Sequence, residues 1–393
     1  MKEVYIVAAR RTPIGSWGGV LKGFSATQLG AEAIKGALAA ANVQPDQVDE
    51  VLMGNVVSAN LGQAPAKQAS IYAGIPNTVP CTQINKVCSS GMKAVMFGAQ
   101  SIMLGQHDIV VAGGMESMSN IPFYNDKVRW GAKFGGFQLI DGLQKDGLVD
   151  AYDHNAMGVC ADATAKKYNF SREDQDAYAI QSYKRAEAAT DSGAFKTEIL
   201  PIAVPQRRGD PVILSEDEEY KNVRYDKIPN LRPAFTKNGT VTAANASTIN
   251  DGAAALILAS AEKVKELGLQ PVAKIISFAD ASHDPAWFTT APSKAAPKAL
   301  KAAGMTIGDI DFFEVNEAFS AVAMAFNADM GINEAKVNIH GGAVSLGHPL
   351  GASGARILAT LNNALQVKDG SVGLAAICNG GGGASAMIIE RVG

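Results

Sequence analysis

The sequence predicts an α/β protein built from two related halves around buried β-sheets. Helical segments alternate with short, nearly continuous apolar stretches, which is typical of strands covered on both faces. Two pairs of matching segments also occur in the same order near the two ends of the 393 residues. With 47% hydrophobic and 19% charged residues, the chain can bury a large core. The repeated segments and the large apolar content together predict a core made of two similar halves.

The first matching pair consists of residues 31–54 (AEAIKGALAAANVQPDQVDEVLMG) and 294–316 (KAAPKALKAAGMTIGDIDFFEVN). Each predicts a helix, a turn and a strand. Within the pair, Val48 corresponds to Ile310 and Asp49 to Asp311. Chance similarity is the alternative explanation, and a second matched pair in the same order argues against it.

The second matching pair consists of CSSGMKAV (88–95) and GASGARIL (351–358). Each is a turn of small residues that begins a helix with apolar spacing. Each helix is followed by an apolar strand that ends in glycines, at 108–114 and 373–381. We therefore expect the two helix starts to face one another.

The middle of the chain, roughly 118–250, has a different composition. It is polar and contains charged patches such as SREDQD (171–176) and SEDEEYKNVR (215–224). We interpret it as an irregular insertion that lies over the two core halves.

Charge and hydropathy exclude several classes of partner. The chain carries 35 Lys+Arg against 38 Asp+Glu, a net charge of −3, so we expect no nucleic acid partner. No segment approaches the roughly 18 consecutive apolar residues of a membrane helix. The N-terminal MKEVYIVAARRTP predicts a first strand and a loop, not a signal peptide.

The cysteines predict a reducing compartment. Cys81, Cys88, Cys160 and Cys378 are too few and too scattered for a disulfide framework or a zinc knuckle. We expect a cytoplasmic protein, or one in an organelle matrix if a presequence has been removed.

Cys88 and His348 are the first candidates for chemistry. Cys88 precedes a helix, where the helix dipole is expected to lower the pKa of its thiol. His348 precedes the matching turn of the other half, between a glycine and a proline. Considered alone, Cys88 reads as a small buried hydrophobe and His348 as a hydrogen-bonded loop residue. The duplication places them opposite each other, which favours His348 as the base that activates Cys88.

Cys378 and Asn316 are further candidates because each ends an apolar strand. Four consecutive glycines follow Asn379 and offer free N–H groups of the kind that an oxyanion hole requires. The alternatives are a strand-end cysteine before a flexible loop and a turn-forming asparagine. Zinc is the rival explanation of the Cys and His residues, but no closely spaced ligand pair exists, so we expect no metal.

At these residues the chain resembles the thiolase family, specifically the biosynthetic acetyl-CoA C-acetyltransferases, over essentially its whole length. The motifs are NKVCSSGMKA, VNEAF, GGAVSLGHPLGASGAR and ICNGGGGASA. The resemblance implies two βαβαβαββ halves that form a layered α-β-α-β-α core. The N-terminal half would span 1–117, completed by about 250–270, and the C-terminal half 271–393. A loop domain over the coenzyme A (CoA) site would span 118–249.

The resemblance also implies the reaction and the roles of the residues. Two acetyl-CoA would condense reversibly to acetoacetyl-CoA and CoA in a ping-pong Claisen reaction. Cys88 would carry the acetyl group, His348 would activate it, and Cys378 would remove the α-proton of the second acetyl-CoA. The N–H groups of Cys88 and Gly380 would hold one thioester oxygen. His348 and a water fixed by Asn316 would hold the other. CoA is substrate and product, and no other cofactor is implied.

The resemblance also implies which residues contact CoA, and most of them are apolar. They are Leu148, Met157, Phe235, Ala243, Ser247, Ala318 and Phe319. Arg224, one of several basic residues that alternate with acids in the middle region, is a candidate contact for the CoA phosphates. The alternative is that such residues only form a solvated face. A plain turn serine is the alternative for Ser247.

Two positions depart from the biosynthetic pattern. Many relatives have a histidine where this chain has Ala156, and His154 is a possible substitute. Trp287 and Phe288 stand where some relatives have a methionine near the acyl pocket, and such bulk would favour short acyl groups.

The main alternative is a degradative 3-ketoacyl-CoA thiolase for longer chains, because both directions use the same residues. A decarboxylating ketoacyl synthase is disfavoured by Cys378, since decarboxylation needs no α-proton base. A non-catalytic scaffold is disfavoured because Cys88, His348 and Cys378 are all present. The family is commonly a dimer or a dimer of dimers, so a homo-oligomer, in particular a homotetramer, is expected.

Overall fold

The N-terminal half of the protein contains five main strands and three helices in the order βαβαβαββ. The structure is a computed structural model that describes residues 1–393. The elements are β1 (Val4–Arg11), α1 (Ala26–Ala41), β3 (Glu50–Gly54), α2 (Pro65–Tyr72), β4 (Cys81–Ile84), α3 (Ser90–Met103), β5 (Ile109–Ser117) and β10 (Asn250–Ser260). A short strand, β2 (Gly15–Ser16), pairs with the start of β10.

The C-terminal half repeats this order with one strand fewer. Its elements are β11 (Ala273–Ser282), α7 (Pro292–Ala303), β12 (Phe312–Val315), α8 (Ser320–Met330), α9 (Ala343–Leu346), α10 (Leu350–Val367), β13 (Val372–Asn379) and β14 (Gly383–Arg391). The helix α6 (Ala261–Leu267) links the two halves. No helix of the protein is both long and apolar enough to cross a membrane.

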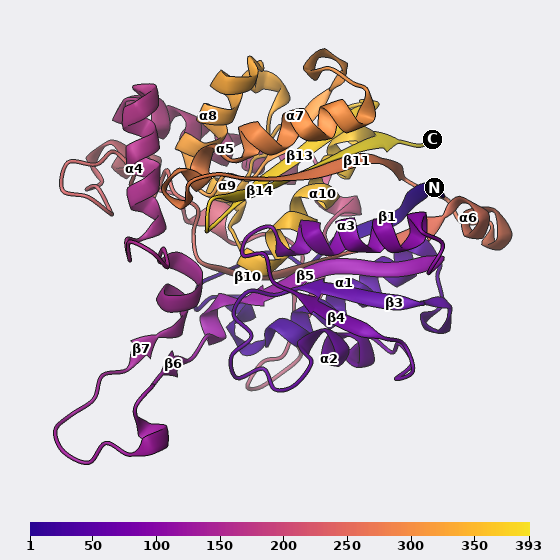
Figure 1. Ribbon diagram of the computed structural model, residues 1–393, viewed down its shortest axis with the longest axis horizontal. Helices are drawn as coiled ribbons and strands as arrows, with labels where there is room; N and C mark the ends of the chain where they lie inside the picture. The colour runs from indigo at the N-terminus through magenta and orange to yellow at the C-terminus, as the bar shows by residue number, and fades with distance from the viewer.

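The strands form five layers with the helices, in agreement with the layered core that the resemblance implies (Figure 1). The helices α3 and α10 are packed between the sheets of the two halves, in one apolar core. The helices α1 and α2 cover the outer face of the N-terminal sheet, and α7 and α8 that of the C-terminal sheet. The motifs that open α3 and α10 therefore lie at the centre of the molecule.

The two sheets are joined edge to edge, which the sequence does not indicate. The strand order is β4-β3-β5-β10-β1 in the N-terminal half and continues as β11-β14-β13-β12. The junction is short, because β1 pairs with β11 only at Tyr5–Lys274 and Ile6–Ala273.

The duplication extends to single hydrogen bonds. Asp49 accepts hydrogen bonds from the backbone N–H groups of Asp108 and Ile109, both at 2.8 Å, at the start of β5. Asp311 accepts the equivalent bonds from Ser371 and Val372, at 2.7 and 3.0 Å, at the start of β13. The predicted correspondence of Asp49 with Asp311 is thereby confirmed.

One strand of the implied pattern is missing from the C-terminal half, and the side chain of Asn338 takes its place. Only an isolated bridge joins Val337 to Phe313 where the N-terminal half has β4. Asn338 turns away at φ +49. Its amide accepts from the N–H of Val315 and donates to the carbonyl of Val315, both at 2.8 Å. The buried edge of β12 is thus satisfied at Val315 by the side chain of Asn338 and at Phe313 by the backbone N–H of the same asparagine, without a full strand.

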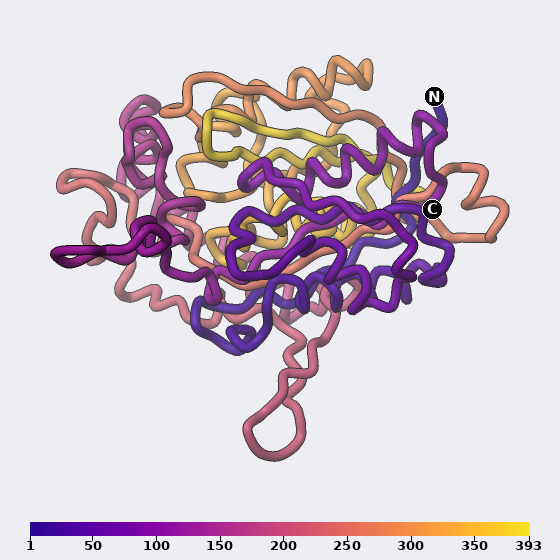
Figure 2. The backbone as a smooth tube through the Cα atoms, turned by 60° about the horizontal axis from the view of Figure 1, so that its bottom comes forward, coloured from indigo at the N-terminus to yellow at the C-terminus, as the bar shows by residue number.

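The segment between β5 and β10 is more ordered than the sequence suggests. It contains the helices α4 (Met157–Tyr168) and α5 (Arg172–Asp191) and two hairpins, β6 (Phe123–Tyr124) with β7 (Ile140–Asp141) and β8 (Ile202–Val204) with β9 (Val212–Leu214). The prediction of an irregular region was wrong at 171–176, because Ser171 and Asp174 form a capping box that starts α5. The two hairpins project from the body (Figures 1 and 2).

Candidate active site

Cys88 lies in a strained turn directly before α3. Val87 has φ +47, in the left-handed region that β-branched residues rarely adopt, at a cost of roughly 1–3 kcal/mol. The turn is closed by Ser90, whose hydroxyl donates to the carbonyl of Val87 at 2.5 Å and accepts from the N–H of Lys86 at 2.8 Å. Strain of this size persists only when its surroundings enforce it, and it often marks a functional residue.

The pKa of the Cys88 thiol is raised, so the prediction of a lowered pKa was wrong. The pKa is about 12, mainly because of burial, and the charge of Glu116 acts in the same direction. The backbone N–H groups of Gly380 and of Cys88 itself act in the opposite direction, because they favour the thiolate. The helix begins only at Ser90, so its dipole does not offset the loss of water around the sulfur. A base is therefore required.

Cys378 lies at the end of β13, before a hairpin turn made by the glycine run. It pairs with Ala384 on β14. Gly381 and Gly382 have φ +81 and +83, and a Cβ on Gly382 would lie 2.1 Å from the carbonyl oxygen of His283. Only glycine fits this turn. At Gly380, in contrast, a Cβ would make only ordinary contacts, with Val87 and Met157, and the N–H of Gly380 faces the sulfur of Cys88.

The two thiols interact. Burial raises the pKa of Cys378, and the charge of Cys88 raises it further. Because a thiolate at either position disfavours ionisation of the other, the pair holds at most one negative charge in the absence of a bound ligand.

His348 is fixed on the loop before α10. Gly347 precedes it at φ +109, and any Cβ on Gly347 would collide with the side chain of Asn250. The same Asn250 accepts the N–H of His348 at 2.8 Å. Burial lowers the pKa of His348 to about 3, and the charge of Arg356 acts in the same direction. The imidazole is therefore neutral at physiological pH and can accept a proton.

Ser353 determines which nitrogen of His348 accepts that proton. The hydroxyl of Ser353 donates to the carbonyl of Pro349 at 2.9 Å, and its oxygen lies 2.6 Å from Nδ1 of His348. Since the hydroxyl hydrogen is already used, the oxygen accepts the Nδ1–H. Nε2 is left with a free lone pair. Sequence reasoning missed Ser353, although it matches Ser90 in the duplicated motif and could have been found there.

Asn316 lies on the open side of the imidazole. Its Nδ2 is 3.5 Å from Nε2 of His348, and its Oδ1 has no hydrogen-bond partner although it is buried. Its backbone N–H donates to the carbonyl of Ala376, which places it at the end of β12. The side chain thus presents both a donor and an acceptor beside the base, as a water-holding residue requires.

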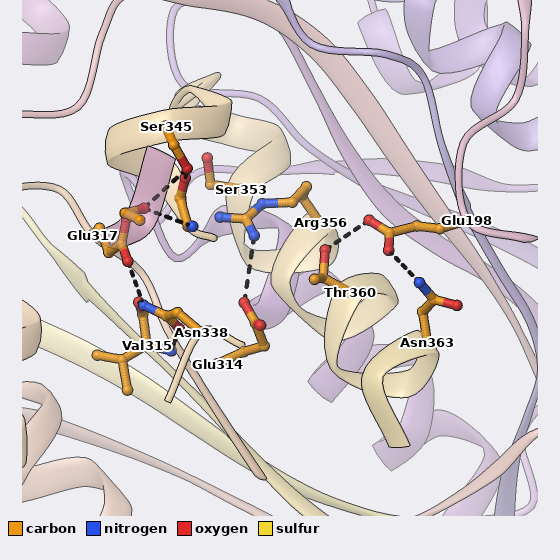
Figure 3. A network of polar contacts seen from close by, with 12 residues as sticks. Glu198, Glu314, Val315, Glu317, Asn338, Ser345, Ser353, Arg356, Thr360 and Asn363 are labelled. Atoms are coloured by element: carbon orange, nitrogen blue, oxygen red, sulfur yellow. Dashed lines mark hydrogen bonds and ion pairs between the residues drawn. The ribbon is translucent and has the colours of Figure 1, made fainter. Parts of the chain in front are cut away.

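A buried polar network supports the His348 loop (Figure 3). Glu317, next to Asn316, accepts from the hydroxyls of Tyr178 and Ser182 on α5 and from the N–H of Val344 on α9. On α10, Arg356 lies 3.5 Å from the carboxylate of Glu314. The network joins three helices and the end of β12 into one rigid support.

A strand end of each half also forms a hydrogen bond with the start of the central helix of the other half. Glu116, at the end of β5, accepts the N–H of Gly351 at 2.8 Å. Asn379, at the end of β13, accepts the hydroxyl of Ser89 at 3.0 Å. Burial raises the pKa of Glu116 to about 7, although four hydrogen bonds to the carboxylate lower it. These supporting residues were missed because each acts across the two halves.

A cavity of about 600 Å³ leads to His348. It is lined by six of the eight predicted CoA contacts, namely Leu148, Met157, Phe235, Ala243, Ser247 and Phe319. Ala318 lies behind this wall, where its carbonyl accepts both the N–H and the hydroxyl of Ser247. Arg224 does not line the cavity; its exposed guanidinium lies 3.8 Å from Asp226. A CoA contact of Arg224 stays a prediction.

The two departures from the family pattern have different surroundings. Ala156 lines the cavity, whereas His154 is exposed and lies outside it. Phe288 is buried in the same apolar cluster as Cys378, Phe319 and Met157. It lines neither the cavity at His348 nor a neighbouring one, so an effect of its bulk on chain length stays a prediction. No group of three or more His, Cys, Asp or Glu side chains is positioned to hold a metal ion.

Two interacting thiols and a neutral imidazole, carried by the central loops and a strand end of a duplicated five-layer fold, are the groups of an enzyme that works by cysteine chemistry. Two family models, described as "Thiolase, N-terminal domain" and "Thiolase, C-terminal domain", match residues 4–262 and 269–391. The chain belongs to the thiolase family.

Individual relatives cover the whole chain. An acetyl-CoA acetyltransferase of Schizosaccharomyces pombe is 57% identical, over 99% of each chain. The cytosolic acetyl-CoA acetyltransferase of Gibberella zeae is 53% identical, over 100% of this chain and 99% of that protein. A mitochondrial one of Mus musculus is also 53% identical, over 100% and 92%. The crystal structure of an Ascaris suum thiolase in complex with coenzyme A is 50% identical, covers 100% of both chains and superposes with a TM-score of 0.95.

Proposed function

We propose that this protein is an acetyl-CoA C-acetyltransferase that interconverts two acetyl-CoA with acetoacetyl-CoA and CoA. The observation that carries the proposal is the packing of the two matched helix starts against each other, with Gly91 against the carbonyl of Gly351. Cys88 precedes one of these helix starts and His348 the other, and the thiol of Cys378 interacts with that of Cys88. The full-length relatives named acetyl-CoA acetyltransferase favour this reaction over the degradative alternative.

In the first half-reaction, Nε2 of His348 takes the proton of Cys88 while the sulfur attacks the thioester carbon of acetyl-CoA. The N–H groups of Cys88 and Gly380 face the sulfur and are suited to hold the oxyanion. The C–S bond to CoA then breaks, and the imidazolium gives its proton to the departing CoA thiolate. The products are S-acetyl-Cys88, CoA and neutral His348.

In the second half-reaction, Nε2 of the neutral His348 takes the proton of Cys378, and the thiolate so formed takes an α-proton from a second acetyl-CoA. The resulting enolate attacks the acetyl group on Cys88, and the Cys88 thiolate leaves. The enolate oxygen needs preorganised donors, each worth roughly 3–4 kcal/mol in comparable sites. The Nε2–H of the His348 imidazolium and a water held by Asn316 are suited to supply them. The imidazolium then returns its proton to the Cys88 thiolate, and Cys378 keeps the α-proton, so that two thiols and a neutral imidazole are restored for the next turnover.

CoA is proposed to lie in the 600 Å³ cavity with its thiol end toward His348. Phe235 and Phe319 form an edge-to-face pair at 5.9 Å on its wall. Gly158 permits this arrangement, because a Cβ there would lie 2.1 Å from the ring of Phe235. This chemistry uses side chains and backbone N–H groups throughout, so we infer no cofactor besides CoA itself.

Thiolysis tests the proposal. The purified protein is given CoA with acetoacetyl-CoA, and then with a longer 3-ketoacyl-CoA. We expect a strong preference for acetoacetyl-CoA, in line with the full-length relatives named acetyl-CoA acetyltransferase. Comparable or faster turnover of the longer chain would establish the degradative alternative. No turnover of either substrate would overturn the proposal.

We further propose that the chain assembles with copies of itself, as a dimer of dimers. The arm formed by β6, β7 and their connection projects from the body (Figure 1). It exposes Phe123, Val128, Trp130, Phe134, Phe137 and Leu139, an apolar surface that an isolated chain rarely presents to water. Light scattering after chromatography should give a tetramer, and removal of the arm should give a smaller species.

The cytoplasm is the proposed compartment, in line with the Gibberella zeae relative that is named as cytosolic. The mitochondrial relative makes an organelle matrix the alternative. Fluorescence of the full-length protein tagged at its C-terminus distinguishes the two.

A further inference from the structure

A second cavity, of about 640 Å³, shares no lining residue with the proposed CoA cavity. It lies between α5, residues 339–340 and the C-terminal end of α10. Lys184, Arg185, Lys368 and His340 line it, and no acidic residue does.

None of the three cations at this cavity forms an ion pair with an acidic side chain. Lys184 and Lys368 form no ion pair, and Arg185 donates to the backbone carbonyls of Val337 and Glu334. Asp369, the residue after Lys368, is paired with Arg391 instead. The cavity thus has three positive charges without an ion-pair partner, on a chain whose net charge is −3. Such a surface attracts a multiply charged anion.

His340 is an unpartnered polar side chain at the same cavity. It is only 3% exposed, and neither Nδ1 nor Nε2 has a hydrogen-bond partner. One edge-to-face contact with Phe195, at 5.8 Å, holds the ring. A neutral imidazole always carries one N–H donor and one acceptor, and leaving them unpaired is unfavourable. The protein supplies no partner, so a bound molecule is the expected one.

The rest of the lining is largely apolar, with Ile180, Ile339 and Val367 among its side chains. A simple inorganic anion would leave this wall uncovered, whereas a phosphate attached to a planar or apolar body would cover it. The volume is in the range that suits a ligand of this size.

We propose that this cavity binds a small organic phosphate of the nucleoside diphosphate class. The phosphates contact Lys184, Arg185 and Lys368, the planar body packs on the apolar wall, and a polar group of the ligand pairs with His340. This site is additional to the CoA cavity and does not depend on the proposed reaction.

The test is a titration with ADP followed by NMR of the histidine rings, in protein carrying ¹³C-labelled histidine. The chain has five histidines, and His340→Asn assigns the relevant signal. We expect the His340 signal to shift saturably, because this ring lines the cavity. A shift of the His348 signal alone would overturn the proposal, since ADP would then bind only along the CoA path.

Charge variants test the same site. Lys184→Gln with Lys368→Gln should weaken ADP binding at His340 by about tenfold or more, since two charge-assisted contacts are lost. Lys265→Gln on α6 is the matched control and should bind ADP unchanged. Unchanged thiolysis in the double variant shows that it is folded. Binding equal to that of the unsubstituted protein would overturn the proposal.

A final titration uses inorganic pyrophosphate, which has the charge but no planar body. We expect weaker binding than for ADP, because the apolar wall stays uncovered. Equal affinity would overturn the assignment to an organic phosphate.

Discussion

The two halves of the protein share a frame but carry different chemistry at matched positions. Asp49 and Asp311 hold the starts of β5 and β13 in the same way, so Ile109 corresponds to Val372. Six residues further on, the N-terminal half has Met115 and the C-terminal half has Cys378. The next positions are Glu116 and Asn379. The ends of the two strands therefore correspond residue by residue, yet only the C-terminal one carries a thiol.

The helix starts differ in the same manner. Ser90 and Ser353 are matched, and each hydroxyl donates to a carbonyl of the loop before its helix. In the N-terminal half the serine closes the Cys88 turn, whereas in the C-terminal half it orients His348. Duplication thus provided two equivalent loops at the molecular centre, and divergence made one a nucleophile and the other a base.

The largest expected effect on activity comes from replacing the two thiols, which should block different steps of the reaction. Cys88→Ser should abolish acylation by acetyl-CoA and lower thiolysis by roughly 10³-fold or more, because the covalent carrier is lost. Cys378→Ser should still form the acyl-enzyme but fail to make or break the carbon–carbon bond. Mass spectrometry of the intact protein measures acylation, with Cys81→Ser as the control. Equal loss of acylation in both variants would refute this division of labour.

The matched serines should differ in their effect on pH dependence. Ser353→Ala removes the acceptor of Nδ1–H and should lower kcat by roughly 10- to 100-fold, because the imidazole is no longer held in one tautomer. The pH profile of kcat should change with it. Ser90→Ala loosens the Cys88 turn and should slow acylation without changing the shape of the profile. Identical pH profiles in the two variants would count against the assigned role of Ser353.

Glu116 should make stability depend on pH, whereas its match Asn379 cannot titrate. The pKa of Glu116 is raised to about 7 from 4.5, so the folded protein binds more protons than the unfolded chain between these values. Stability should therefore fall as pH rises through this range, by at most about 3 kcal/mol relative to Glu116→Gln. Urea unfolding of both proteins at pH 5 and pH 8 measures it. A constant difference between them would contradict the raised pKa.

The smallest expected effect is on stability, and it tests whether Asp49 and Asp311 play the same role in the two halves. Asp49→Ala and Asp311→Ala each remove an acceptor of two backbone N–H groups and should each cost about 1–2 kcal/mol of unfolding free energy. Thermal unfolding of both variants compares them. A loss at one position only would show that the halves are not held alike.

Much of the frame and the principal site residues follow from the sequence. The repeated helix–turn–strand and the repeated small-residue turns predict two halves facing each other, because apolar periodicity and turn residues are local signals. The same motifs single out Cys88, His348, Cys378 and Asn316. The capping box at Ser171 is local as well, and the prediction of an irregular segment overlooked it.

Other features depend on contacts between distant segments. The side chain of Asn338 replaces a strand only because β12 ends beside it, and Asn379 meets Ser89 only because the halves pack together. Arg224 belongs to a basic stretch in the sequence, yet the fold directs it to solvent beside Asp226.

The sequence by itself determined which residues are available for chemistry and that they belong to two equivalent loops. The tertiary structure alone decided their protonation. A helix start predicts a lowered thiol pKa, but packing both sheets around α3 and α10 removes water from Cys88 and raises it to about 12. Burial likewise keeps His348 neutral, and Ser353 selects its tautomer. Desolvation depends on everything that surrounds a group, and those surroundings come from all parts of the chain.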